Sequence, residues 1–235
     1  MLPTVINEYG LAGNGLSGYG MAGDIKGSPP SGWWLSDGIL SANCAAAYRS
    51  KGAASLAASY INLAHPGVHN ITTPAPATWA SGTGWTFNGL TQYLITGVGP
   101  SSNAWSILVC FSGGSQSTGS LFGSIQSTPT RIWNLFSNYT NNKVVYQNDG
   151  TRGVTPGLNS GVIGWAGTTA YRDGMADGTI STINGVSTIG AYLGANNQDG
   201  SPNGWWAGII ESVAIYNITI TDSQAIAVST AMALF

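Results

Sequence analysis

Charged side chains are scarce in this chain of 235 residues: 7% of them are Asp, Glu, Lys or Arg, whereas a soluble domain usually has about 25%. The seven basic residues are scattered and form no basic stripe, which excludes an electrostatic footprint for nucleic acid. No apolar run approaches the roughly 18 residues that span a bilayer, so we expect no membrane insertion. Solubility then depends on neutral polar groups, a pattern that suits a protein buried in an assembly.

The chain has neither a recognisable secretion signal nor a recognisable metal-binding motif. Its first residues, "MLPTVINEYGLAGNG", lack the basic and long apolar segments of a secretory signal peptide, so we expect synthesis in the cytoplasm. Cys44 and Cys110 allow one disulfide, but two reduced core cysteines fit the missing signal peptide better, and both alternatives stay open. Together with His65 and His69 they lack the close CxxC spacing of structural zinc, which predicts no metal site.

Glycine and aromatic residues are abundant instead, with 34 Gly, nine Trp and ten Tyr. Short apolar segments such as "AWSILVCFSG", "TRIWNLFSN" and "NKVVYQND" alternate with turn residues about every 10 to 15 positions. This rhythm predicts an all-β sandwich or jelly roll rather than βαβ units, and no linker divides it into two domains. Asn88-Gly89, between the expected strands Gly84–Phe87 and Gln92–Thr96, predicts a hairpin turn.

Residues 1–30 differ from the rest of the chain. Glycine recurs there every two to four positions, large apolar side chains are few, and Pro29-Pro30 follow. Such a segment cannot form its own core, so it is either a flexible tail or an extended arm ordered only against a neighbouring subunit. If it is an arm, the side chains available for assembly are Glu8, Tyr9, Leu11, Leu16, Tyr19 and Met21.

The C-terminal segment carries a helix signal. Thr221 stands three residues before Gln224, the spacing of a capping box, and apolar residues then recur at helical intervals. We therefore expect one helix over 222–233. The alanine-rich stretch Ser55–Leu63 fits either a short helix or an irregular strand.

Four motifs, in their order along the chain, resemble laminin-G-like domains of the concanavalin A-like lectin/glucanase superfamily. They are Phe87-Asn88-Gly89, the strand Trp105–Phe111, the hairpin Tyr171-Arg172-Asp173-Gly174 and the strand Gly208–Asn217. The resemblance covers residues 33–235 and is weakest over 42–64. It implies a concanavalin A-like, two-sheet antiparallel jelly roll with a short C-terminal helix. We therefore expect one laminin-G-like β-sandwich domain over 31–235, and the glycine-rich arm over 1–30 lies outside the resemblance.

The superfamily includes glucanases, whose carboxylates alternate in a Glu-x-Asp-x-Glu run that this sequence lacks. Hydrolysis of a glycosidic bond needs two carboxylates at a set separation, and the glutamates here are Glu8 and Glu211. Asp173 and Asp177 lie on an expected hairpin turn. Strict alternation along "GIIESVAIY" places Glu211 on the apolar face of Ile209, Val213 and Ile215, where we expect a structural acid that holds backbone N–H groups of a loop. We therefore expect a protein without enzymatic activity.

The stretch "NNQDGSPNGWW" holds the best candidates for a binding site. Its residues Asn196, Asn197, Asp199 and Asn203 offer more oxygen donors than a turn requires. Trp205 and Trp206 are adjacent on an expected strand and face opposite sides, so one belongs to the core, and Trp205 adds an aromatic face for a sugar ring. Calcium at the sandwich rim is a weaker alternative because the stretch has one carboxylate. We expect no other cofactor.

Two functional hypotheses remain, and the first is a non-enzymatic structural protein of a bacteriophage virion. It would decorate a capsid or belong to a tail or fibre, docked through the arm 1–30, as a homo-oligomer or part of a larger assembly on the virion surface. The alternative is an extracellular lectin-like module that binds glycans through rim loops.

Overall fold

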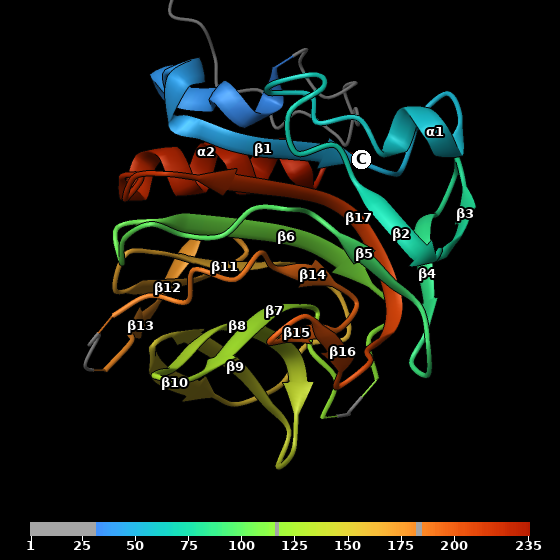
Figure 1. Ribbon diagram of the computed structural model, residues 1–235. Helices are drawn as coiled ribbons and strands as arrows, with labels where there is room; N and C mark the ends of the chain where they lie inside the picture. The colour runs from blue at the N-terminus through green and yellow to red at the C-terminus, as the bar shows by residue number, and fades with distance from the viewer. Residues whose placement is uncertain (1–31, 116–117, 182–184) are drawn as a thin grey trace, which may run out of the picture.

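Figure 1 shows the computed structural model, which describes residues 32–115, 118–181 and 185–235. Two antiparallel sheets pack face to face, and the helices α2 and η1 lie on the outer side of the first sheet, so that the molecule has three layers. The predicted all-β, two-sheet jelly-roll sandwich with a short C-terminal helix is confirmed. Residues 1–31, which include the arm residues Glu8, Tyr9, Leu11, Leu16, Tyr19 and Met21, lie outside the described part.

The first sheet has eight strands in the order β13-β12-β11-β6-β17-β4-β3, with β1 beside the far half of β17. They are β1 (Cys44–Arg49), β3 (Thr78–Ala80), β4 (Gly84–Asn88), β6 (Ser106–Ser112), β11 (Gly161–Ala166), β12 (Thr169–Arg172), β13 (Met175–Thr179) and β17 (Ala207–Tyr216). Both faces of this sheet are covered, which explains why the central strand β6 reads as a continuous apolar run.

The second sheet has nine strands in the order β10-β9-β8-β7-β14-β5-β2, with the hairpin β15–β16 attached to β7. They are β2 (Thr72–Ala75), β5 (Tyr93–Ile95), β7 (Phe122–Ser127), β8 (Thr130–Tyr139), β9 (Lys143–Asn148), β10 (Gly150–Val154), β14 (Tyr192–Leu193), β15 (Asn196–Gln198) and β16 (Ser201–Asn203). All pairings are antiparallel except the short contact between β15 and β7.

Large aromatic side chains fill the space between the sheets. Trp133 of the second sheet meets Trp165 of the first with ring centroids 6.0 Å apart, and Phe122 packs on both. Trp206 is fully buried in the same core, as expected for one member of the Trp205-Trp206 pair. Burial of such side chains stabilises the fold by about 1.5–3 kcal/mol each.

The third layer covers the outer face of the first sheet. It consists of α2 (Asp222–Met232) and the short helices η1 (Trp33–Gly38) and η2 (Ser41–Asn43), while α1 (Leu56–Ser59) lies at one end of the sandwich (Figure 1). Helix α2 begins with the predicted capping box, since Thr221 and Gln224 each accept the other's backbone N–H. Cys44 on β1 and Cys110 on β6 are free and buried between the first sheet and this layer, as predicted for reduced core cysteines.

The hairpin predicted at Asn88-Gly89 is wrong. Strand β4 belongs to the first sheet and β5 to the second, so the turn carries the chain from one sheet to the other. The side-chain oxygen of Asn88 accepts the N–H groups of Leu90 and Thr91 at 2.9 and 3.1 Å, which makes a local turn without strand pairing. The hairpin predicted at Asp173-Gly174, between β12 and β13, is confirmed.

The strict alternation expected along "GIIESVAIY" is also wrong. A bulge between Ile210 and Ser212 places Ile210 in the same core as Val213 and Ile215. Glu211 lies at this bulge, where its carboxylate accepts from Lys51 Nζ at 2.8 Å and Ser112 Oγ at 2.6 Å. Its partners are side chains rather than the loop N–H groups that the sequence suggested.

Candidate functional site

The outer face of the second sheet carries no helix in the described part, and strands β8, β9 and β10 form a groove on it. Its volume is about 350 Å³, within the usual range for small-ligand sites. The lining residues are Phe136, Tyr139, Thr140, Asn141, Lys143, Val145, Gln147, Thr151 and Gly153. None of them belongs to the rim stretch 196–205 that the sequence favoured.

The floor of the groove is apolar because of strand alternation. Leu135 on β8 and Tyr146 on β9 point into the core between the sheets, so their neighbours Phe136 and Val145 point outward. These two residues are paired across the strands and are only 7% and 8% exposed. They form a compact apolar surface under the groove.

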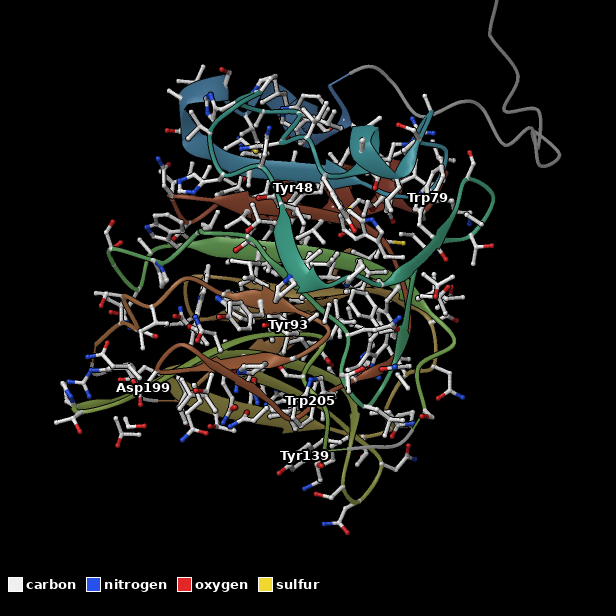
Figure 2. The ribbon with its side chains drawn as sticks, turned by 45° about the vertical axis from the view of Figure 1, so that its right-hand side comes forward. Tyr48, Trp79, Tyr93, Tyr139, Asp199 and Trp205 are labelled. Carbon is white, nitrogen blue, oxygen red and sulfur yellow. The ribbon has the colours of Figure 1, made fainter. Side chains whose placement is uncertain are left out.

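Tyr139 forms one wall of the groove. A register shift between Phe136 and Tyr139 interrupts the pairing of β8 with β9. As a result the Tyr139 ring lies beside the Phe136 ring, with centroids 4.8 Å apart and planes inclined by 58°. Tyr139 remains partly exposed at the end of β8, where it is labelled in Figure 2, and its ring is available to a ligand.

Strands β9 and β10 supply three polar side chains of the groove, and the turn before β9 supplies Thr140 and Asn141. Gln147 and Thr151 are directly opposite each other, and the Gln147 amide donates to the Thr151 hydroxyl at 3.2 Å. Lys143 is paired with Tyr139 across the turn. A methyl group added at Gly153 would lie 3.3 Å from Cδ of Lys143, so the lysine stem runs across this glycine.

The turn between β8 and β9 is held in place from outside the groove. Asn141 and Asn142 have φ values of 63° and 54°, a conformation that asparagine tolerates better than most residues. The N–H of Gly157 donates to both the backbone and side-chain oxygens of Asn142, at 2.9 and 3.2 Å. Asn138 donates to Asn159 at 3.1 Å, so two connections tie this end of the groove to the loop after β10.

A second aromatic pair lies on the same sheet face. Tyr192 of β14 and Tyr93 of β5 are stacked with centroids 4.9 Å apart, and burial raises the pKa of the Tyr192 hydroxyl. Tyr192 is opposite Gly123, which is opposite Asn134, which is opposite Gln147 in the groove. In Figure 2, Tyr93, Trp205 and Tyr139 are labelled one below another.

Four of the predicted rim residues lie in the hairpin β15–β16, and most of their polar groups have partners within the hairpin or on neighbouring segments. Asn197 donates to the Gly190 carbonyl at 2.7 Å and accepts from Gly200 N at 2.8 Å. Asp199, at the left of Figure 2, accepts from Ser127 N at 3.2 Å, and Asn203 donates to Gln198. Within the described residues no three His, Cys, Asp or Glu side chains come together to hold a metal ion.

Asn196 and Trp205 differ from the other rim residues. The side-chain oxygens of Asn196 and Asn134 are buried without a hydrogen-bond donor among the described residues, and both lie against Gly123. Trp205 is partly exposed, whereas its buried Nε1 also has no acceptor in the described part. The structure therefore separates Trp205 from the core residue Trp206, as the strand geometry predicted.

Comparison with solved structures gives partial matches of low sequence identity. No protein family and no curated protein sequence matches the chain. Domain 4 of an extracellular GH43 arabinanase from Geobacillus stearothermophilus, solved with arabinotriose, matches with a TM-score of 0.49 and 16% identity over 80% of this chain and 98% of that one. A sialidase from Trypanosoma rangeli, solved with sialic acid, matches with a TM-score of 0.47 and 13% identity over 78% and 32% of the two chains.

The NanB sialidase from Streptococcus pneumoniae matches with a TM-score of 0.43 and 18% identity, over 62% of this chain and 27% of that one. The chain thus spans about a third or less of the sialidases it matches. All three TM-scores lie below 0.5. No helix among the described residues is long and apolar enough to cross a bilayer.

The groove residues were not singled out by the sequence. The signal that was available is the alternation in "LFSNYTNNKVVYQ", which places Phe136, Val145 and Gln147 on one face of a hairpin. Lys143 shares the face of Val145 and Gln147 by the same alternation, whereas Tyr139 does not follow from it, because the register shift beside Phe136 reorients the end of β8.

Proposed function

We propose that this protein is a carbohydrate-binding module that holds a saccharide in the groove over β8, β9 and β10. One observation carries the proposal: an apolar floor, an exposed tyrosine ring and an amide–hydroxyl pair line one groove of about 350 Å³. A pyranose ring has an apolar C–H face and a polar rim of hydroxyls. The C–H face can pack against the rings of Tyr139 and Phe136, and the hydroxyls can form hydrogen bonds with the side chains of Gln147 and Thr151.

The groove is built to bind without rearrangement. Its floor is buried against neighbouring strands, and its turn is tied to Gly157 and Asn159 by hydrogen bonds. A preformed site loses little conformational entropy when a ligand enters.

Binding without cleavage is part of the proposal. The lining contains no Asp or Glu, whereas most glycosidases place two carboxyl groups about 5–9.5 Å apart around the scissile bond. The virion role predicted from the sequence depends on the arm 1–30, outside the described residues, and stays a prediction. The same holds for a location on the virion surface or outside the cell.

The test is a glycan array followed by calorimetric titration of the best oligosaccharide. Tyr139→Ala is expected to weaken binding about tenfold, since loss of ring stacking costs about 1–1.5 kcal/mol. Tyr139→Phe should bind as the wild type does, because it keeps the ring. Leu90→Ala, at an exposed side chain that does not line the groove, is the control. Equal affinities of wild type and Tyr139→Ala would remove the groove as the site.

A further inference from the structure

Building on the proposed function, we infer that the groove selects an acidic saccharide, one that carries a carboxylate or a sulfate, and that Lys143 is the residue that selects it. Lys143 is the only charged residue in the lining. The remainder of the lining is apolar or neutral polar. An anionic group on the ligand would therefore meet one cation and no competing carboxylate of the groove.

The ammonium group of Lys143 has no interaction partner in the described part of the chain. The other described cations all have partners: Lys51 pairs with Glu211, Arg131 with Asp149 and Arg172 with Asp177, Arg152 donates to the Asp177 carbonyl, and Arg49 lies over the Phe235 ring. Lys143 forms no ion pair, side-chain hydrogen bond or ring contact with any described residue. In a chain with so few charges, a cation without a structural partner points to a ligand.

The position of Lys143 suits a substituent on a sugar that packs against Tyr139. The two residues are paired across the turn, and side chains so paired stand about 4.5–5.5 Å apart at Cβ. That spacing is similar to the width of a pyranose ring. A sugar stacked on the tyrosine then brings a group at its edge, such as the carboxylate of a hexuronate, to the lysine.

Gly153 contributes by leaving room for the lysine stem. A methyl group there would lie 3.3 Å from Cδ of Lys143 and 3.9 Å from Val145. The stem runs over bare backbone at this point, in the way that long cationic side chains cover apolar surface while their heads stay in water. A methyl group at position 153 would require the stem to shift by a few tenths of an ångström.

The attraction is local rather than long-range, because the whole chain has a formal net charge of −2. A charge-assisted hydrogen bond between an ammonium and a carboxylate or sulfate is stronger than a neutral one. At a partly exposed site it remains sensitive to salt. We expect an acidic oligosaccharide to bind about tenfold more tightly than its neutral counterpart at low ionic strength, and this preference to shrink as salt is added.

The test compares matched ligands by calorimetric titration. Oligogalacturonate is paired with its methyl ester, and a sulfated galactan oligosaccharide with its desulfated form, so that the two arms distinguish carboxylate from sulfate. Lys143→Gln is expected to lose the roughly tenfold preference, measured as the ratio of its affinities for the acidic and the neutral ligand of each pair. Lys143→Arg should keep the preference, and Gly153→Ala should weaken it with an unchanged melting temperature.

The outcomes separate this inference from the proposed function. Binding of neutral and acidic ligands with equal affinity by the wild type would overturn the inference and leave the proposed function standing. A preference that persists in Lys143→Gln would overturn it as well, since another group would then be the selector. Failure of the wild type to bind any oligosaccharide, with Tyr139→Ala indistinguishable from it, would overturn both.

Discussion

At the scale of single residues, Gly123 on β7 makes room for polar side chains on the outer face of the second sheet. The buried side-chain oxygens of Asn134 and Asn196 lie where a side chain at this position would be, together with the hydroxyl of Ser120. Gly123 therefore allows two asparagines from different strands to approach each other beside the groove. The approach depends on the missing Cβ and not on an unusual backbone angle.

Gly123→Ala is predicted to lower the free energy of unfolding by about 1–3 kcal/mol, because the added methyl group overlaps both asparagine oxygens and the sheet must shift. Urea denaturation monitored by tryptophan fluorescence measures the change. Gly82→Ala is the matched control, since a methyl group there meets no atom within 4 Å. A loss equal to that of the control would show that the asparagines move aside at no cost.

The two cysteines give a pH dependence with a definite sign. Burial raises the pKa of the Cys44 and Cys110 thiols from 9.0 to about 12. Above pH 9 the unfolded chain releases protons that the folded chain keeps, so this contribution to stability is complete below pH 9 and is lost as the pH rises toward 12.

We therefore predict that the free energy of unfolding falls between pH 9 and 12. Denaturant titrations at a series of pH values under reducing conditions give the profile. In the native state at pH 8, a thiol reagent should modify both cysteines much more slowly than it modifies free cysteine. Rapid modification of the folded protein, or a flat profile, would contradict the burial of the thiols.

At the scale of elements, local signals in the sequence predicted those parts that are built from neighbouring residues. The capping box of Thr221 and Gln224 fixes the start of α2, and Asp173-Gly174 makes the turn that joins β12 to β13. Both depend on a few consecutive residues, whose hydrogen bonds close within the segment itself.

Features that depend on a partner strand were not predictable in the same way. Asn88-Gly89 has the composition of a hairpin turn, but the next strand pairs in the other sheet. The bulge at Glu211 lies where β17 leaves β4 and begins to pair with β1, and Ser50 there donates to the Ile210 carbonyl at 2.5 Å. Such a bulge is set by the strands on either side, so alternation in one segment cannot reveal it.

The candidate site follows the same division. Outward positions such as Phe136, Val145 and Gln147 can be read from alternation within a hairpin. The location of Tyr139 beside Phe136 depends on a register shift, and the isolation of Lys143 depends on which distant acids the other cations meet. A binding groove built from such long-range pairings cannot be read from one segment.

At the scale of the whole molecule, the three layers give the protein two different faces, one formed by helices and one formed by the strands of the second sheet. The helices α2 and η1 cover the outer face of the first sheet. The groove lies on the outer face of the second sheet, over its strands β8, β9 and β10 (Figure 1). The described chain begins at Gly32 and Trp33, within the helical layer, where Trp33 packs against Phe235. The arm is thus attached on the side away from the groove.

We therefore predict that assembly through the arm and the proposed glycan binding are separable. Deletion of residues 1–28 is predicted to abolish assembly and leave a folded monomer, because the glycine-rich arm has no core of its own and was expected to be ordered by a neighbouring subunit. Light scattering coupled to size-exclusion chromatography measures the mass of both forms. Oligosaccharide affinity should be unchanged in the truncated protein, since the groove lies two layers away from the point of attachment. If the truncated chain assembles as the full chain does, the arm is not the assembly element, and an oligomer would have to form through the folded domain.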